Sequence, residues 1–262
     1  MEKYIHEKTL VFTVTTNGYK FLTWNLWLHF QKLQVPWKLL ILCLDKDSHR
    51  FFTTIANIPS VILPDIHLQV KGDPTKIASH GSGDFNRITK LKLDAFTYLL
   101  KQPAIERLFY LDSDIVPFRD PVPYLQTTLT HEHPLWFQCD EHNPEYTCSR
   151  RNHGCGNCCT GVIGFYLADQ TVRNRFLEMV SFNADLWKEC PDNNDQEYIQ
   201  KKMDLLQMTL QTFPRDLFPN GSFLRDNHWQ TLREPYLLHF NYIVGVNKQR
   251  VIKSKGFWLV PY

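Results

Sequence analysis

The sequence predicts an α/β fold, in which a continuous mixed, mostly parallel central sheet is flanked by helices. Short apolar or β-branched segments alternate with helical patterns through the first 112 residues, which is typical of a Rossmann-like unit. Lys38–Asp45 reads KLLILCLD, a continuous apolar run typical of a parallel strand that is covered on both faces. The second half mixes strands with helices and contains no repeat or low-complexity linker. We therefore expect a single domain over residues 1–262.

Strands are expected in the first half wherever an apolar or β-branched segment is bounded by turn-forming residues. These segments are Leu10–Thr16, Lys38–Asp45, Val61–Leu63 and Arg107–Asp112.

Two helices are expected between these strands. Tyr19–Leu33 is apolar on nearly every side, which predicts a helix buried all round. In Asn86–Leu100 the apolar residues Ile88, Leu91, Ala95 and Leu99 recur every three or four positions, which predicts a second helix. Residues 70–84 are rich in glycine, proline and serine and are expected to form a loop.

The second half is expected to contribute both element types. The same patterns predict strands at Leu135–Cys139, Val162–Leu167 and Tyr236–Phe240, and helices at Thr171–Trp187 and Asp195–Met203.

Composition excludes several classes of protein. The chain is 43% hydrophobic and 21% charged, as in ordinary globular proteins. Its net charge of +2, with no Lys/Arg run longer than two, argues against a nucleic-acid partner. The longest apolar run, Leu39–Leu44, is far shorter than the roughly 20 residues of a membrane span, so none is expected. The N-terminus lacks an apolar segment of signal-peptide length, so we expect a cytoplasmic protein.

Asp112-Ser113-Asp114 carries the most chemical information. Four apolar residues run directly into two carboxylates at positions i and i+2, which leave the same face of an extended chain. Open α/β sheets bind ligands at the carboxyl ends of their strands, where these two residues are expected. Paired carboxylate oxygens suit Mg²⁺ or Mn²⁺ and, through the metal, a diphosphate.

Two other interpretations of this segment stay open. The aspartates are also typical of a turn after a buried strand. The stretch Asp112–Val116 in addition fits the haloacid-dehalogenase phosphatase pattern, in which the first aspartate is a nucleophile. That pattern usually follows the first strand of its fold, whereas three strands are expected before Asp112.

An ordered set of short blocks surrounds this motif. They are Val11–Asn17, Lys90–Leu91, Leu111–Val116, Cys159–Gly164, Asn194–Gln196 and His239–Lys248. In these blocks and their order the chain resembles the GT-A glycosyltransferases with an Asp-x-Asp motif. It is most similar to the nucleotide-diphospho-sugar transferase group that includes plant rhamnogalacturonan xylosyltransferase-like enzymes. Glycogenin and lipooligosaccharide galactosyltransferases resemble it more distantly.

The resemblance implies a role for each block. Asp112, Asp114 and His239 would bind a divalent metal, and an imidazole ligand suits Mn²⁺ better than Mg²⁺. The residues implied to bind the donor nucleotide and its diphosphate are Thr13, Thr15, Asn17, Lys90, Asp112, Ser113, Asp114, Thr160, Gly245 and Lys248.

Asp140, Thr160, Asp195 and Gln196 match positions around the transferred sugar, and Asp195, Gln196 and Asp140 are the implied catalytic residues. Helix N-capping by Asn194 or Asp195 is the alternative interpretation of the Asn194–Gln196 block, since capping needs the same residue types.

The implied reaction transfers a sugar from a UDP-sugar to a hydroxyl of a glycan or glycoprotein acceptor, with retention of anomeric configuration. Gln196 is a poor nucleophile, which favours a same-face route assisted by the leaving phosphate. Residues up to about 120 would bind the nucleotide, and residues from about 121 the sugar and acceptor. The alternative from another class is a catalytically silent protein that binds nucleotide-sugars or glycans.

Seven cysteines are present, and four of them crowd the stretch from Cys148 to Cys159. Cys155-x-x-Cys158 has zinc-knuckle spacing, with Cys139, Cys148 and His153 as candidate partners. Disulfides in an oxidising compartment and reduced cysteines beside the site are the alternatives.

Overall fold

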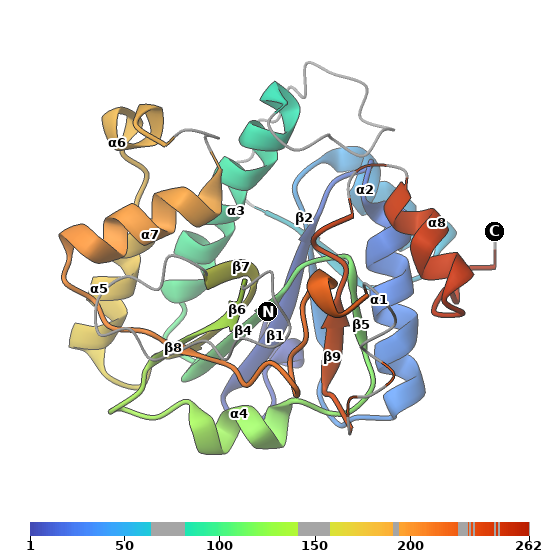
Figure 1. The fold of residues 1–262 in the computed structure, drawn as a ribbon, viewed down its shortest axis with the longest axis horizontal. Helices are drawn as coiled ribbons and strands as arrows, with labels where there is room; N and C mark the ends of the chain where they lie inside the picture. The colour runs from blue at the N-terminus through green and yellow to red at the C-terminus, as the bar shows by residue number, and fades with distance from the viewer. Residues whose placement is uncertain are drawn as a thin grey trace.

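The central sheet has seven strands. A computed structural model describes residues 1–63, 82–140, 158–190, 194–224, 230, 232, 234–243, 245 and 247–261. Within them, the spatial order of the strands is β3 (Ser60–Ile62), β2 (Leu39–Cys43), β1 (Thr9–Thr15), β4 (Arg107–Leu111), β7 (Cys158–Tyr166), β6 (Leu135–Cys139) and β8 (Gln211–Thr212) (Figure 1). β7 runs antiparallel to β4 and β6, and every other neighbouring pair is parallel. The predicted mixed, mostly parallel sheet is confirmed.

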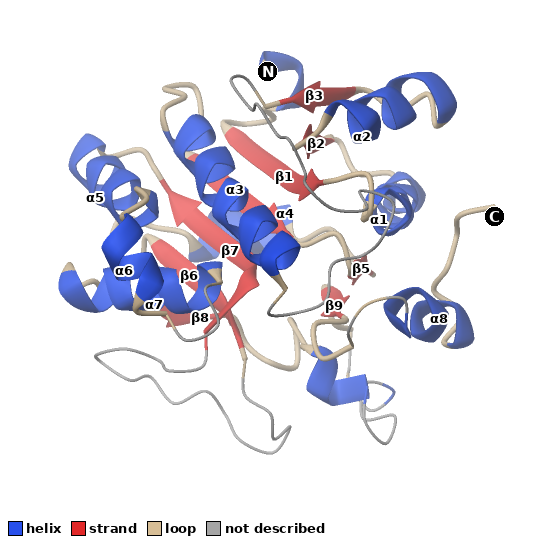
Figure 2. Cartoon of the chain, turned by 90° about the horizontal axis from the view of Figure 1, so that it is seen from above, coloured by secondary structure: helices blue, strands red, loops and turns tan. Residues whose placement is uncertain are grey.

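Helices cover both faces of this sheet (Figure 2). One face packs against α3 (Gly83–Leu100), α5 (Gln170–Val180) and α7 (Asp195–Leu205). The other face packs against α1 (Lys20–Leu33) and α4 (Val122–Thr128). A small second sheet of β5 (Ile115–Pro117) and β9 (Leu237–His239) lies beside α1 on that second face.

Shorter elements complete the described chain. They are the 3₁₀ turn Glu2–Tyr4, α2 (Lys46–Arg50), the π-helix Phe51–Ile55, α6 (Ala184–Lys188) and α8 (Asn247–Ser254).

Alternation along β1 assigns its side chains to the two layers. Leu10, Phe12 and Val14 enter the core under α3, whereas Val11 enters the core under α1. All seven residues of β1 are buried. The strand is therefore covered on both faces, which explains its continuous β-branched and apolar sequence.

Most predicted strands are found within one or two residues of their expected ends, but four predictions need correction. The strand expected at Val162–Leu167 already begins at Cys158. The helix expected at Thr171–Trp187 is two helices, because the chain is extended at Ser181 and Asn183 caps α6 through the amides of Asp185 and Leu186.

The predicted burial of α1 on every side is wrong. Gln31 and Lys32 are exposed and Trp27 is only partly buried, because the helix is an outer layer of the fold. α3 begins at Gly83, within the expected loop, because Ser82 caps it by accepting a hydrogen bond from the amide of Phe85. The rest of that loop lies outside the described residues.

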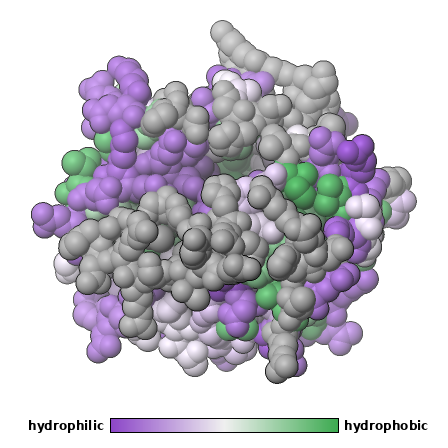
Figure 3. Space-filling model, in the orientation of Figure 1, coloured by the Kyte–Doolittle hydropathy of each residue, from purple (hydrophilic) through white to green (hydrophobic). Residues whose placement is uncertain are grey.

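The described surface on the side shown in Figure 3 is mainly hydrophilic, with hydrophobic residues in small separate patches. Among the described helices, none combines the length and the apolar character that crossing a bilayer requires.

Candidate active site

Three elements bring Asp112, Asp114 and His239 together. β4 ends at Leu111, and the Asp112 amide donates to the Gly161 carbonyl on β7 at 2.7 Å. The chain turns through Ser113 and Asp114 into β5, so the motif is not extended as expected. β9 pairs antiparallel with β5, and this pairing places His239 opposite Ile115, the residue after Asp114.

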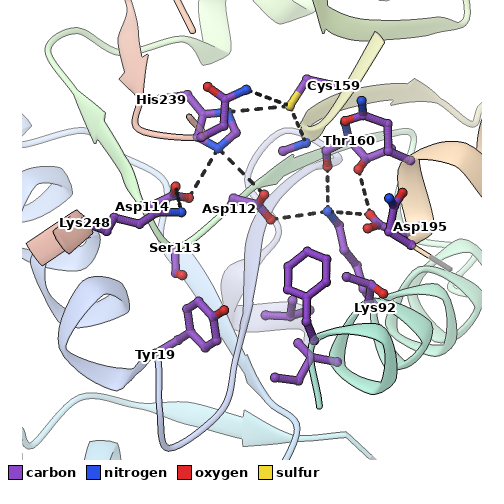
Figure 4. Close-up of a pocket in the computed structure, with 18 of the residues that line it drawn as sticks. Tyr19, Lys92, Asp112, Ser113, Asp114, Cys159, Thr160, Asp195, His239 and Lys248 are labelled. Atoms are coloured by element: carbon purple, nitrogen blue, oxygen red, sulfur yellow. Dashed lines mark hydrogen bonds and ion pairs between the residues drawn. The ribbon is translucent and has the colours of Figure 1, made fainter. Parts of the chain in front are cut away.

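One ligand atom from each of these three side chains lies within 4.8 Å of the other two. His239 Nε2 is 3.3 Å from Asp114 Oδ1 and 3.8 Å from Asp112 Oδ2 (Figure 4). Two carboxylates and one imidazole are a donor set that suits Mn²⁺. The predicted convergence of residues 127 positions apart in sequence is therefore present, and the donor set fits a divalent cation.

Asp114 is buried and ionised. Burial alone disfavours its charge, but the attraction of Lys248 and His239 outweighs burial and holds the pKa of Asp114 well below its usual range. Lys248 Nζ lies 2.6 Å from Asp114 Oδ2, so an ammonium group balances the carboxylate directly.

Gly161 leaves the space that this cluster occupies. A Cβ atom on Gly161 would lie 2.1 Å from His239 Cε1 and 2.8 Å from Asp112 Oδ2. Any larger residue would displace the imidazole or the carboxylate, so the glycine in β7 is a steric requirement of the cluster.

Lys92 links the aspartate motif to the other end of the cleft. Its Nζ is 3.3 Å from Asp112 Oδ1, 2.9 Å from Asp195 Oδ2 and 2.7 Å from the carbonyl of Thr160. Burial disfavours the ammonium form, but the two carboxylates outweigh burial and raise the pKa of Lys92 above its ordinary value. Lys92 is therefore a fixed positive charge inside the cleft, and the hydroxyl of Tyr110 donates to the same Asp112 oxygen.

Asp195 faces the cleft because its neighbour caps the helix. Asn194 is the N-cap of α7 and accepts a hydrogen bond from the amide of Glu197 at 2.9 Å. Asp195 is buried and accepts from the hydroxyl of Thr160 at 2.7 Å. The capping interpretation thus applies to Asn194, and the Asp195 carboxylate is held by Lys92 and Thr160.

Asp140 is the second carboxylate at this end of the cleft. Its Oδ2 accepts from Gln196 Nε2 at 3.0 Å. Its Oδ1 accepts from Asn241 Nδ2 at 2.8 Å and from the Tyr242 hydroxyl at 3.1 Å. Three neutral donors therefore fix the orientation of this carboxylate.

All these groups line one cleft with a volume of about 400 Å³. Eleven of the predicted site residues line it: Thr15, Asp112, Ser113, Asp114, Asp140, Thr160, Asp195, Gln196, His239, Lys248 and Gly245. Of these, Gly245 has a φ of 62°, a backbone conformation that favours glycine.

Three predicted residues lie elsewhere. Thr13 is buried within β1, directly before Val14, the first residue of β1 that lines the cleft. Asn17 donates its amide hydrogen to Asp45 and accepts from Lys20. Lys90 lies with its Nζ 3.9 Å from the ring centre of Phe182.

Sequence reasoning missed Lys92 and Tyr19 as cleft residues. Lys92 is four residues after Ile88 and three before Ala95, on the apolar face of the predicted helix, and a lysine there needs a buried partner. Tyr19 precedes α1 and lines the cleft, where burial and the two motif aspartates raise its pKa. The helical spacing was a usable signal for Lys92, but nothing in the sequence marks Tyr19.

The cysteine prediction is mostly untested. Cys148, His153 and Cys155 lie outside the described residues. Cys158 is a buried thiol whose Sγ lies 3.4 Å from Gln200 Nε2. Cys139 is disulfide-bonded, so the disulfide interpretation holds at this cysteine. For the cysteines outside the described residues, the zinc, disulfide and reduced interpretations are not tested.

Comparison with known proteins gives one family. The family model described as nucleotide-diphospho-sugar transferase matches residues 37–251, which is most of the chain. No curated protein sequence matches the chain. Neither the haloacid-dehalogenase alternative nor a catalytically silent protein finds support in this match.

Solved structures of glycosyltransferases have the same fold. An active-site mutant of LgtC has a TM-score of 0.55 at 11% identity, over 94% of this chain and 95% of that chain. The apo form of mouse xyloside xylosyltransferase 1 has a TM-score of 0.54 at 13% identity, over 88% and 97%. The chain spans less than half of the WbbM bifunctional glycosyltransferase, 46%, with 90% of this chain covered, a TM-score of 0.52 and 11% identity. At these identities the likeness establishes the fold, and the predicted GT-A architecture is confirmed.

Proposed function

The chain belongs to the nucleotide-diphospho-sugar transferase family and is a glycosyltransferase, and from this premise we propose a metal-dependent transfer from a UDP-sugar. The acceptor is a hydroxyl of a glycan or glycoprotein. The observation that carries the proposal is the convergence of Asp112, Asp114 and His239 at one end of a cleft that also contains two lysines.

Asp112, Asp114 and His239 would hold Mn²⁺, or Mg²⁺ with lower preference, because two carboxylates and an imidazole form the donor set. When bound, the cation supplies positive charge for the diphosphate of the donor. Lys248 adds an ammonium group on the same side of the cleft, on the first turn of α8. It acts on the charge that builds on the departing diphosphate, so its effect belongs to the transition state.

The sugar is proposed to lie between Lys92 and the Asp140 network. Asp195 and Asp140 offer carboxylate oxygens to sugar hydroxyls, and the amide of Gln196 offers both a donor and an acceptor. This placement gives a role to the hydrogen-bonded polar groups at the end of the cleft away from Lys248.

Retention of anomeric configuration is proposed to follow the same-face route. Besides the motif pair, the carboxylates among the described cleft residues are Asp140 and Asp195. Asp195 is paired with an ammonium group and a hydroxyl, and Asp140 accepts three hydrogen bonds. Such pairing lowers the nucleophilicity of a carboxylate, which favours assistance by the leaving phosphate.

We further propose that residues 1–262 act as one glycosyltransferase domain. Residues before about 120 would contact the nucleotide, and later residues the sugar and acceptor. The cleft supports this division, because both parts of the chain line it.

A screen of nucleotide-sugars tests the proposal. UDP- and GDP-sugars are incubated with glycan acceptors, with and without Mn²⁺, and release of the nucleoside diphosphate is measured. We expect release from a UDP-sugar that depends on Mn²⁺, and a loss of at least about 100-fold in Asp114→Ala, since that variant removes charge stabilisation of the transition state. Full activity of Asp114→Ala with Mn²⁺ would refute the metal-dependent mechanism. Anomeric proton couplings of the product decide between retention and inversion.

A further inference from the structure

Gln138 lies behind His239, on the side of the imidazole away from the aspartates. Its Oε1 is 2.6 Å from His239 Nδ1, while His239 Nε2 faces Asp112 and Asp114. Gln138 is 0% and His239 1% exposed, so solvent does not compete for this contact. The contact is therefore a fixed part of the surroundings of the imidazole.

Two backbone carbonyls fix the orientation of the Gln138 amide. Nε2 of Gln138 is 3.1 Å from the carbonyl oxygen of Phe218 and 3.0 Å from that of Pro219. Carbonyl oxygens only accept hydrogen bonds, so the NH₂ group of the amide must face them and its oxygen must face His239. The reversed amide would place three acceptors in contact and remove the Gln138 donor from the Phe218 carbonyl, while the Pro219 carbonyl would keep only the backbone amide of His239 at 3.1 Å.

This orientation determines where the neutral imidazole carries its proton. The oxygen of Gln138 accepts but cannot donate, so His239 must donate from Nδ1. The lone pair of the neutral ring is then on Nε2, which is the nitrogen that faces the aspartates. A cation ligand needs that lone pair.

The sheet is irregular at the residue that makes this contact. Along β6, Phe137 pairs with Ile163 on β7, but the next residue, Gln138, pairs with Cys159. This register shift is a bulge, a device that redirects side chains next to functional sites. It lies beside Gly161, so the same irregularity serves both the amide and the glycine gap.

We propose that Gln138 is a positioning residue, which holds His239 in the Nδ1-protonated tautomer and so presents Nε2 to the cation. The inference rests on the metal site of the proposed function. Removal of such an outer partner typically lowers metal affinity by about 10- to 100-fold.

The first test measures the tautomer without any metal. Protein labelled with [¹⁵N]histidine is examined at about pH 8, where a histidine is ordinarily neutral, and His239→Ala identifies the signal. We expect the two-bond proton–nitrogen pattern of the Nδ1-protonated ring in the wild type, and its loss in Gln138→Met. An Nε2-protonated ring in the wild-type protein would overturn the proposal.

The second test titrates Mn²⁺ alone and follows free Mn²⁺ by electron paramagnetic resonance. We expect binding to Gln138→Met to be about 10- to 100-fold weaker, and Gln138→Glu, which keeps an acceptor oxygen, to bind more tightly than Gln138→Met. Gln200→Met is the matched control, because Gln200 also donates to a carbonyl, that of Cys158, without touching a proposed ligand. Equal Mn²⁺ affinities for Gln138→Met and Gln200→Met would contradict the proposal.

These tests separate two failures. If His239→Ala binds Mn²⁺ as tightly as the wild type, the proposed metal site is wrong, whereas the tautomer measurement still judges Gln138. If Gln138→Met does not fold, the wild-type tautomer and the Gln138→Glu titration decide the question.

Discussion

Lys248 occupies a position that a divalent cation would contest. Its Nζ contacts Asp114 Oδ2 at 2.6 Å, and that oxygen belongs to a proposed metal ligand. The ammonium group and a cation would compete for the charge of this carboxylate. We therefore expect cation binding to weaken the contact between Lys248 and Asp114 and to free the ammonium group to reach the donor diphosphate. Lys248 is thus expected to weaken the binding of the cation and to strengthen the binding of the donor diphosphate.

Lys248→Met is expected to bind Mn²⁺ more tightly in the absence of nucleotide, because no ammonium group competes for Asp114. A charge-assisted hydrogen bond contributes about 1.5 kcal/mol or more, so the gain is on the order of tenfold. UDP binding in the presence of Mn²⁺ is expected to weaken by a similar factor. Isothermal titration calorimetry measures both affinities.

Lys253→Met is the control for that substitution, since Lys253 is exposed on the same helix and carries the same charge. The coupling is absent if both variants bind Mn²⁺ equally, or if Lys248→Met retains the UDP affinity of the control.

At the residue scale, the chemical type of the site residues can be predicted from the sequence, whereas their contacts cannot. Asp112 and Asp114 could be identified because paired carboxylates at the carboxyl end of a buried strand suit a divalent cation. The resemblance implies that Lys90 binds the donor, whereas the lysine of this helix that lines the cleft is Lys92. Two residues span about 200° around a helix, so the two lysines point to nearly opposite sides. Gln138 could not be found, because its role depends on carbonyls about 80 residues away.

At the scale of the element, β7 is a buried strand in which one glycine leaves room for the side chains of His239 and Asp112. Its central glycine, Gly161, lies against His239 and Asp112, and the register shift against β6 falls in the same part of the strand. The strand therefore supports the cluster sterically, and a methyl group there acts on ligand geometry as well as on packing.

Gly161→Ala is expected to weaken Mn²⁺ binding by at least about tenfold and to destabilise the protein by about 1–3 kcal/mol, as overpacking does. The reason is the 2.1 Å approach of the new Cβ to His239 Cε1. Mn²⁺ titration and urea unfolding measure the two effects.

Gly83→Ala is the matched control, because no neighbouring atom lies within 4 Å of its added Cβ. It should keep Mn²⁺ affinity and change stability by no more than about 1 kcal/mol. Wild-type Mn²⁺ affinity in Gly161→Ala would show that the glycine is not needed for the cluster.

Elements with a strong pattern could be predicted, and short or polar ones could not. Leu135–Cys139 was predicted to the residue because it is a compact apolar strand. β5 has only three residues, and its pairing with β9 depends on a contact across more than 120 positions. α8 has a mostly polar sequence, with only Ile252 buried, so its periodicity gives little signal.

At the scale of the whole molecule, Arg173 on α5 joins its helix to the chain at the end of α3 and at the edge of the central sheet. Its guanidinium donates to the carbonyls of Leu100 at the end of α3 and Gln102 after it, of Ile105 before β4, and of Leu167 after β7. The side chain thereby satisfies four backbone acceptors where three segments of the chain meet, at the opposite ends of β4 and α3 from the cleft.

Arg173→Met should therefore affect stability and leave the site intact. It keeps an apolar stem but leaves four carbonyls without their donor, and an unpaired buried acceptor costs about 1–3 kcal/mol each. Because the loop carbonyls can relax toward water, we expect a net loss of about 3–5 kcal/mol in the free energy of unfolding. Urea unfolding measures the loss, and Mn²⁺ affinity of the folded protein should equal that of the wild type.

The matched control is Arg175→Met on the same helix, where Arg175 is exposed and donates to a single carbonyl, that of Leu206. Equal stability losses for Arg173→Met and Arg175→Met would mean that the four-carbonyl contact does not hold the layers together. Weaker Mn²⁺ binding in folded Arg173→Met would instead mean that the distant edge of the sheet positions the cleft. The expected separation follows from the architecture, because the strands that carry the motif are buried on both faces and hold their own register.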